Sequence, residues 1–156
     1  MTGTDCASLP TPCFVIDEAA LRRNCETLAA VRGRTRCRML LALKAFALWR
    51  TFPLIRGYLD GICASGPWEA RLGREEFGGE VHVFAPAYSD ADIDELLPIA
   101  DHLHFNSTAQ WQRFKQRVQS APRMIECGIR INPGHSESPV EKYSPCCPFS
   151  RLGNAR

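Results

Sequence analysis

The sequence predicts an α/β fold in which parallel strands alternate with helices. Short apolar segments recur roughly every 20–25 residues, and helical patterns lie between them, as in repeated βα units. Helix-capping residues precede three of the helical patterns, at Asp17, Ser89 and Ser107. Two architectures fit these observations. One is a partial, truncated (β/α)8 barrel of the TIM type with about five βα units, and the other is a five-stranded open doubly wound sheet.

The individual elements follow from local patterns of apolar and turn residues. Strands are expected at 13–16, 38–43, 61–64, 80–84, 102–105 and 127–131. Helices are expected at 18–31 and 47–58, from Pro67 to the pair Gly78 and Gly79, and after Ser89 and Ser107. Residues 1–12 are expected to be a loose lead-in, and 133–156 a long loop or tail without a closing helix.

The length of the chain and the character of its tail favour the partial barrel. A complete barrel needs about 250 residues, and this chain has 156. A self-contained sheet would normally end with a helix that covers its last strand, and none is evident. We therefore expect residues 1–156 to form a single incomplete domain.

Composition argues against several classes of partner. The net charge is +2, which indicates no particular acidic partner. The arginine-rich segment 32–38 lacks interleaved aromatic residues, so we expect a solvated loop and no nucleic-acid contact. No apolar run is long enough for a membrane span, and the start lacks the pattern of a signal peptide. Eight scattered cysteines without a Cys-x-x-Cys pair fit a reduced, cytoplasmic protein.

Lys44 is the first candidate for chemistry, because it is the only charged residue in the apolar segment 39–48. The chain has three lysines against sixteen arginines, so a lysine here suggests that arginine would not serve. Burial lowers the pKa of a lysine and frees a nucleophilic amine, which a Schiff base with a carbonyl substrate or pyridoxal phosphate requires. The ordinary alternative is a lysine at a strand end whose head group reaches into water.

Further candidates lie at the carboxyl ends of the expected strands, where ligands bind in both architectures. Ser65, Glu69, Asn106 and Arg130 all belong to this edge. A lysine, a carboxylate and an arginine together suit an anionic cofactor that carries an aldehyde. Glu69 could instead simply favour the start of its helix, and Arg130 could form an ion pair within the sheet.

The histidines give no metal site in this interpretation. We expect His102 and His104, which alternate with apolar residues on one strand, to face opposite sides and therefore not to share a metal. The histidines and cysteines also lack zinc-ligand spacing. His135, in the tail, is a weak candidate for a substrate contact, and the alternative is an exposed side chain without a role.

Five segments of the sequence together carry a resemblance to known proteins. The segments TPCFVID at 11–17 and ALKAF at 42–46 resemble the start of the fold-type III pyridoxal-phosphate enzymes. The segments CASGPWEA at 63–70, RINPGHSE at 130–137 and PCCPFSRLG at 145–153 narrow the resemblance to the carboxynorspermidine decarboxylase family. It spans nearly the whole chain, and the family continues for roughly the same length again.

The resemblance implies a function and a set of site residues. Lys44 would form the Schiff base with pyridoxal 5'-phosphate, and Ser65, Glu69 and Arg130 would lie near the cofactor. The substrate would be carboxynorspermidine or carboxyspermidine in polyamine biosynthesis, the full-length enzyme would be a homodimer, and the chain alone would be an inactive fragment. Alternatives are a diaminopimelate- or ornithine-type decarboxylase, a racemase, a cofactor carrier, or a non-enzymatic α/β binding domain.

Overall fold

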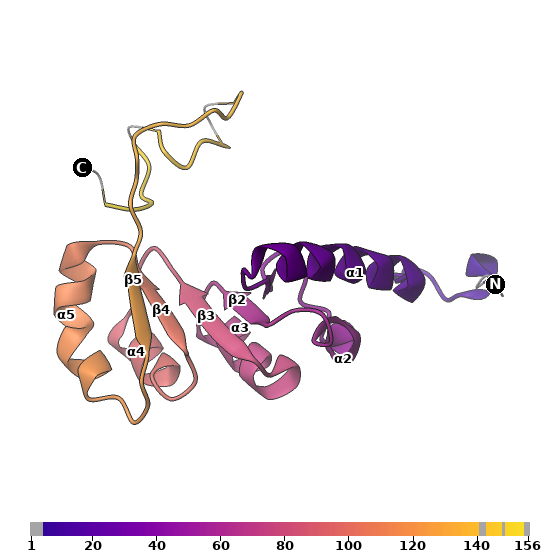
Figure 1. Ribbon diagram of the computed structural model, residues 1–156, viewed down its shortest axis with the longest axis horizontal. Coiled ribbons are helices and arrows are strands. Elements are labelled where there is room, and N and C mark those ends of the chain that lie inside the picture. The colour runs from indigo at the N-terminus through magenta and orange to yellow at the C-terminus, as the bar shows by residue number, and fades with distance from the viewer. Residues whose placement is uncertain (1–4, 141–142, 148, 155–156) are drawn as a thin grey trace.

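The chain forms one sheet of five parallel strands (Figure 1). The computed structural model describes residues 5–140, 143–147 and 149–154. The strands pair in the order in which they occur: β1 (Leu40–Ala42), β2 (Gly61–Ala64), β3 (Glu80–Phe84), β4 (His102–Phe105) and β5 (Glu126–Ile129). In a sequential order every right-handed crossover advances in the same direction, so the helices collect on one face. A doubly wound sheet reverses direction, so the partial barrel is confirmed and the open-sheet alternative is wrong.

Helices connect consecutive strands. In Figure 1, α3 and α4 lie behind the strands, and α1 extends away from the sheet. The elements are η1 (Cys6–Ser8), α1 (Glu18–Thr35), η2 (Trp49–Thr51), α2 (Phe52–Ile55), α3 (Pro67–Leu72), the π-helical turn η3 (Gly73–Phe77), α4 (Asp90–Leu96) and α5 (Thr108–Gln119).

The expected helix caps are present. The Asp17 carboxylate accepts a hydrogen bond from the backbone N–H of Ala20 at 3.0 Å. Ser89 and Asp92 form a reciprocal capping box at the start of α4. The Ser107 hydroxyl accepts from the N–H of Gln110 at 3.1 Å, while the Gln110 side chain accepts from the N–H of Asn106. The capping residues therefore set the starts of these three helices.

The two faces of the sheet differ in burial. One face packs against the helices, and its strand residues Ile62, Ala64, Val81, Val83, Leu103 and Phe105 are almost completely buried. The alternate residues of β3 and β4 point to the other face and are only partly buried. That second face is the interior of a barrel, and no helix covers it in Figure 1.

The core lies between the helices and the sheet. Phe52 and Phe77 meet edge to face with ring centroids 5.4 Å apart, and Phe105 contacts Trp111 at the same centroid distance. The π-helical turn η3 packs so closely on β2 that a Cβ on Gly73 would lie 2.3 Å from Cγ1 of Ile62. Only glycine allows that approach, so Gly73 fixes the position of η3 on the sheet.

Several expected boundaries are wrong. Residues 13–16 form no strand: Phe14 is fully exposed, and no strand of the described residues pairs with this segment. The helix expected at 18–31 continues to Thr35. The helix expected at 47–58 shrinks to η2 and α2, because Pro53 is tolerated only in a first turn. The strand expected at 38–43 is reduced to β1, and that expected at 127–131 starts at Glu126 and ends at Ile129.

The described residues after β5 belong to no named helix or strand, but the segment returns to the sheet. Ile131 and Asn154 form an isolated parallel bridge. The N–H of Asn132 donates to the carbonyl of Asn154 at 2.9 Å, and the N–H of Asn154 donates to the carbonyl of Arg130 at 2.8 Å. The expected long loop is therefore anchored beside the end of β5. Residues 141–142, 148 and 155–156 of this expected loop, like residues 1–4 of the expected lead-in, lie outside the described residues.

Among the helices described by the structure, none has the length and apolar character needed to cross a membrane. The described cysteines Cys13, Cys25, Cys37, Cys63, Cys127, Cys146 and Cys147 are free thiols.

Candidate functional site

Lys44 lies at the carboxyl edge of the sheet, in the turn that follows β1. The carbonyl of Ala42 accepts hydrogen bonds from the N–H groups of Ala45 and Phe46, at 3.0 and 3.1 Å, and so closes the turn. The preceding residue, Leu43, is buried against the core and anchors the turn. The Lys44 side chain itself is exposed, so the expected burial of its amine is wrong for the described residues. The physical reason is that β1 lies at the edge of the sheet, where none of the described strands pairs with its outer side.

Ser65 and Glu69 lie at the end of the neighbouring strand, β2, and are joined to each other. The N–H of Ser65 donates to Oε2 of Glu69 at 2.7 Å, so the carboxylate closes the loop that leads into α3. This is the structural alternative for Glu69, and it leaves the second carboxylate oxygen available. Burial raises the pKa of the Cys63 thiol. The Lys44 ammonium lowers that pKa, and the Glu69 carboxylate raises it. Lys44, Cys63 and Glu69 therefore occupy one neighbourhood.

Arg130 lies directly after β5 and crosses the carboxyl edge of the sheet. Its N–H donates to the carbonyl of Phe105 at 2.9 Å. Its guanidinium carbon lies 4.9 Å from the centre of the Phe84 ring on β3, a cation–π contact. A cavity of about 260 Å³ is lined by Phe84, His104, Ile129 and Arg130. The arginine thus extends from β5 across β4 in the direction of β1, where Lys44 lies.

Asn106 has a role within the fold, and His135 lies in the exposed tail. The Asn106 amide donates to the carbonyl of Arg151 at 2.8 Å, and its carbonyl oxygen accepts from the N–H of Gly153 at 2.7 Å. Asn106 therefore holds the returning tail. His135 is exposed, and its Nε2 lies 4.0 Å from a carboxylate oxygen of Glu137. Its weak assignment as a substrate contact stays a prediction.

The expectation that His102 and His104 face opposite sides is wrong. Residues two apart in a strand point to the same face. Their rings, with that of His82, form a parallel group on the open face of the sheet: the centroids of His82 and His102 are 3.8 Å apart, and His104 lies 6.2 and 6.5 Å from them. Burial, followed by the neighbouring His102, lowers the pKa of His82 to about 4.

Phe84, His104 and Tyr88 also lie near the candidate site, and the sequence did not single them out as site residues. The Tyr88 hydroxyl accepts from the N–H of Ala85 at 2.9 Å and donates to the carbonyl of His104 at 3.1 Å, so it joins the ends of β3 and β4. Burial raises the pKa of Tyr88. Strict alternation in β3 and β4 was the signal that places Phe84 and His104 on the open face.

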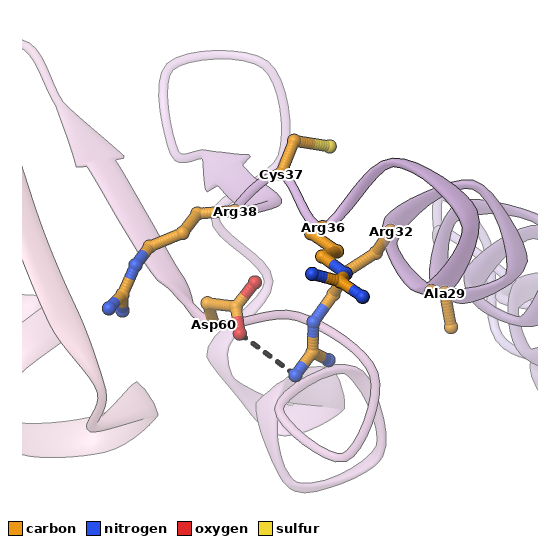
Figure 2. A pocket seen from close by; sticks show the side chains of 7 residues that line it. Ala29, Arg32, Arg36, Cys37, Arg38 and Asp60 are labelled. Atoms are coloured by element: carbon orange, nitrogen blue, oxygen red, sulfur yellow. Dashed lines mark ion pairs between the residues drawn. The ribbon is translucent and has the colours of Figure 1, made fainter.

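A second hollow, of about 400 Å³, lies at the opposite end of the sheet (Figure 2). It contains most of the arginine-rich segment, which was expected to be a solvated loop. Arg32 pairs with Asp60 at 3.0 Å and donates to the carbonyl of Tyr58 at 2.9 Å, and Arg38 pairs with Glu80. Two of these arginines therefore hold α1 and the approach to β1 against the amino ends of β2 and β3.

The residues at the carboxyl edge fit an anionic aldehyde cofactor in part. An accessible lysine amine lies on the same edge of the sheet as a guanidinium, and the guanidinium borders a cavity with an aromatic wall. Glu69 offers less than expected, because one of its oxygens is committed to Ser65. The arrangement can hold an anion and present an amine to a carbonyl carbon.

Comparison with known proteins identifies relatives of the whole described sheet. No protein-family model matches the chain. Over 147 residues, 94% of the chain, it is 43% identical to the carboxyaminopropylagmatine decarboxylase of Synechocystis sp. and 41% identical to the carboxynorspermidine/carboxyspermidine decarboxylase of Herminiimonas arsenicoxydans. It is 37% identical over 145 residues to the carboxynorspermidine/carboxyspermidine decarboxylase of Campylobacter jejuni. The chain spans 37–39% of the length of these relatives.

A solved structure has the same fold. The crystal structure of carboxynorspermidine decarboxylase from Campylobacter jejuni, complexed with norspermidine, superposes with a TM-score of 0.81 at 33% identity. The superposition covers 94% of this chain and 36% of the other. The fold of this chain thus matches a part of the barrel of that decarboxylase. More particularly, the chain is homologous to an amino-terminal part of the carboxy(nor)spermidine decarboxylases.

Proposed function

We propose that this chain carries the amino-terminal part of the active site of a pyridoxal-phosphate-dependent carboxy-lyase that acts on carboxynorspermidine or carboxyspermidine. The observation that supports the proposal most is the identity of 37–43% with three decarboxylases of carboxylated polyamines, which extends over 93–94% of the chain. The racemase, carrier and non-enzymatic alternatives lack a comparable relative among these proteins.

The roles of the residues follow from their places in the fold. Lys44 would hold the cofactor through its ε-amine, since it projects from the carboxyl edge beside Cys63 and Glu69. Arg130, which lines the cavity with Phe84 and His104, would orient an anionic group of the cofactor or substrate. When bound, pyridoxal phosphate would supply the electron sink that the loss of carbon dioxide requires. Glu69 would keep the loop after β2 in shape through its bond to Ser65.

A second substrate has a specific observation in its favour. The relative with 43% identity is a carboxyaminopropylagmatine decarboxylase, which is slightly more similar than the two carboxynorspermidine/carboxyspermidine decarboxylases. All three names describe a carboxylated polyamine, so the class of substrate is shared. Agmatine differs from the polyamines in its guanidinium end, so the discriminating contact must lie at that end of the substrate.

The role of Lys44 can be tested without turnover. The chain is incubated with pyridoxal phosphate, reduced with borohydride and digested, and the labelled peptides are mapped. We expect label at Lys44 in preference to Lys115, which is also exposed and serves as an internal control on α5. A Lys44→Ala variant should lose the specific label. Equal labelling of Lys44 and Lys115 would mean that the amine at the carboxyl edge has no special affinity for the cofactor.

The proposed substrate class is tested by carbon dioxide release from carboxynorspermidine, carboxyspermidine and carboxyaminopropylagmatine. We propose that the 156 residues alone release none of it, because Lys44 is exposed and the interior face of the sheet is open to water. A longer protein that contains this chain should decarboxylate one of the three, and Lys44→Ala in that protein should not. Turnover by the 156 residues above the Lys44→Ala background would refute the proposal that they are inactive alone.

A further inference from the structure

Three potential metal ligands lie together on the open face of the sheet, toward the amino ends of β3 and β4. They are Glu80, His82 and His102, and each is only partly buried. Glu80 and His82 are two apart on β3, and His102 is the direct partner of His82 on β4. The group lies at the opposite end of the strands from Lys44 and belongs to none of the proposed catalytic roles.

The candidate ligand atoms of the three side chains lie near enough to one another to reach a single ion. One ligand atom from each residue lies within 4.8 Å of the other two. Nε2 of His82 is 3.1 Å from Oε2 of Glu80, and the rings of His82 and His102 are stacked with an angle of 12° between their planes. Ligands at zinc bond lengths of about 2.0–2.1 Å lie about 3.4 Å from one another in a tetrahedral site. Because a nitrogen lone pair lies in the plane of its ring, the two stacked imidazoles must turn about their Cβ–Cγ bonds to direct their nitrogens at one ion between them.

The surroundings of the group are compatible with a divalent cation. Arg38 pairs with the other oxygen of Glu80, Oε1, and leaves Oε2 directed at His82. A carboxylate oxygen of Glu126 on β5 lies 3.5 Å from Nδ1 of His102 and offers a further ligand. His104 lies two residues further along β4 and presents a third imidazole on the same face. The two carboxylates favour a cation here, and the Arg38 guanidinium offsets part of their charge.

We propose that Glu80, His82 and His102 form a binding site for a zinc ion or a related borderline divalent ion such as Co²⁺. Two imidazoles and one carboxylate are a ligand set that proteins use for zinc, with the remaining position open to water or to Glu126. The ion would join β3 to β4 on the side of the sheet that the helices leave uncovered. The assignment is independent of the proposed decarboxylase function.

The test is a titration of the purified chain with ZnCl₂ at pH 7.5, followed by calorimetry, with CoCl₂ titrated in parallel and followed by absorption. We expect one ion per chain with a dissociation constant of about 10 μM or lower, and the visible bands of Co²⁺ in a four-coordinate site. His82→Ala and His102→Ala should each weaken binding at least about 10-fold, since even residues behind the ligands have effects of that size. His135→Ala, a change of an exposed histidine in the tail, is the matched control and should bind as the parent does.

Glu80→Gln guards against misfolding, because glutamine keeps the shape of the side chain and an oxygen that can face His82. It should retain the far-ultraviolet circular dichroism of the parent and still weaken zinc binding at least about 10-fold. Binding weaker than about 100 μM by the parent, or equal binding by the parent and all three site variants, would overturn the proposal. Loss of binding in His135→Ala would assign the ion to the tail and would overturn it as well.

Discussion

Replacement of Asp101 should destabilise the chain far more than replacement of an ordinary surface carboxylate. Asp101 precedes β4, and its side chain is 22% exposed. Its Oδ2 accepts from the N–H of Val81 at 2.8 Å and from the Arg74 guanidinium at 2.5 Å, and its Oδ1 accepts from Arg123. Although burial raises the pKa of Asp101, the Val81 N–H and the Arg74 guanidinium hold it below its usual value. One carboxylate thus joins β3, the turn η3 and the segment before β5.

The size of the effect follows from these contacts. In Asp101→Ala the N–H of Val81, a fully buried residue, loses its side-chain acceptor, which costs about 1–3 kcal/mol. The two ion pairs are partly exposed, so each adds only about 0.5 kcal/mol. The free energy of unfolding should therefore fall by about 2–4 kcal/mol. With a urea dependence of about 2 kcal/mol per molar, the midpoint should fall by about 1–2 M.

Urea unfolding followed by circular dichroism and tryptophan fluorescence measures this change. Asp94→Ala is the matched control, because the Asp94 side chain is 68% exposed and pairs with Arg117 at the surface. Its effect should be about 0.5 kcal/mol or less. Equal midpoints for the two variants would show that water replaces the Asp101 carboxylate at little cost, and the assignment of Asp101 as a link between strands would be wrong.

Three other predictions concern the sheet edge, a helix cap and a thiol. Gly128→Ala should lower the free energy of unfolding by about 1–3 kcal/mol in the same urea assay, because the new Cβ would lie 2.5 Å from Nδ1 of His104. Gly33→Ala is the control and should not destabilise the chain, because a Cβ at Gly33 would meet nothing within 4 Å. Ser89→Ala should cost about 1 kcal/mol through loss of the capping box, and an unchanged thermal midpoint would contradict this. At pH 7.5 iodoacetamide should modify Cys63 more slowly than the exposed Cys13 and Cys37, because burial raises the pKa of the Cys63 thiol. The difference in rate should shrink as the pH rises. Equal rates at pH 7.5, measured by peptide mapping, would refute this prediction.

The sequence alone was sufficient to predict the sheet, and three of its strands show why. The expected strands 61–64, 80–84 and 102–105 have the bounds of β2, β3 and β4. Each is a short apolar or alternating segment bounded by glycine, acidic or capping residues, so local chemistry marks both ends. The segment 13–16 has the same local pattern and forms no strand, because a strand also needs a neighbour, which a local pattern cannot supply.

The sequence was enough to predict where the candidate site lies on the sheet, but not which of its residues contact one another. Lys44 and Arg130 lie at the carboxyl edge as expected, because parallel strands bring their ends together. The contact of Arg130 with Phe84 joins β5 to β3 across an intervening strand, and no spacing along the chain encodes it. The exposure of Lys44 depends on β1 being an edge strand. The pairing of Asn154 with Ile131 involves a polar residue at the end of a long loop, and the pattern of apolar residues there gives no indication of it.

The sequential pairing of β1 to β5 bears on how the molecule is synthesised. Each strand binds the strand made immediately before it, so every interstrand contact spans a short stretch of chain. Short spans close with little loss of chain entropy and favour rapid folding. A nascent chain leaving the ribosome can therefore add one strand and one helix at a time to a structure that already exists. Throughout that process the newest strand is the edge of the sheet, and its unpaired backbone groups bind the strand that emerges next.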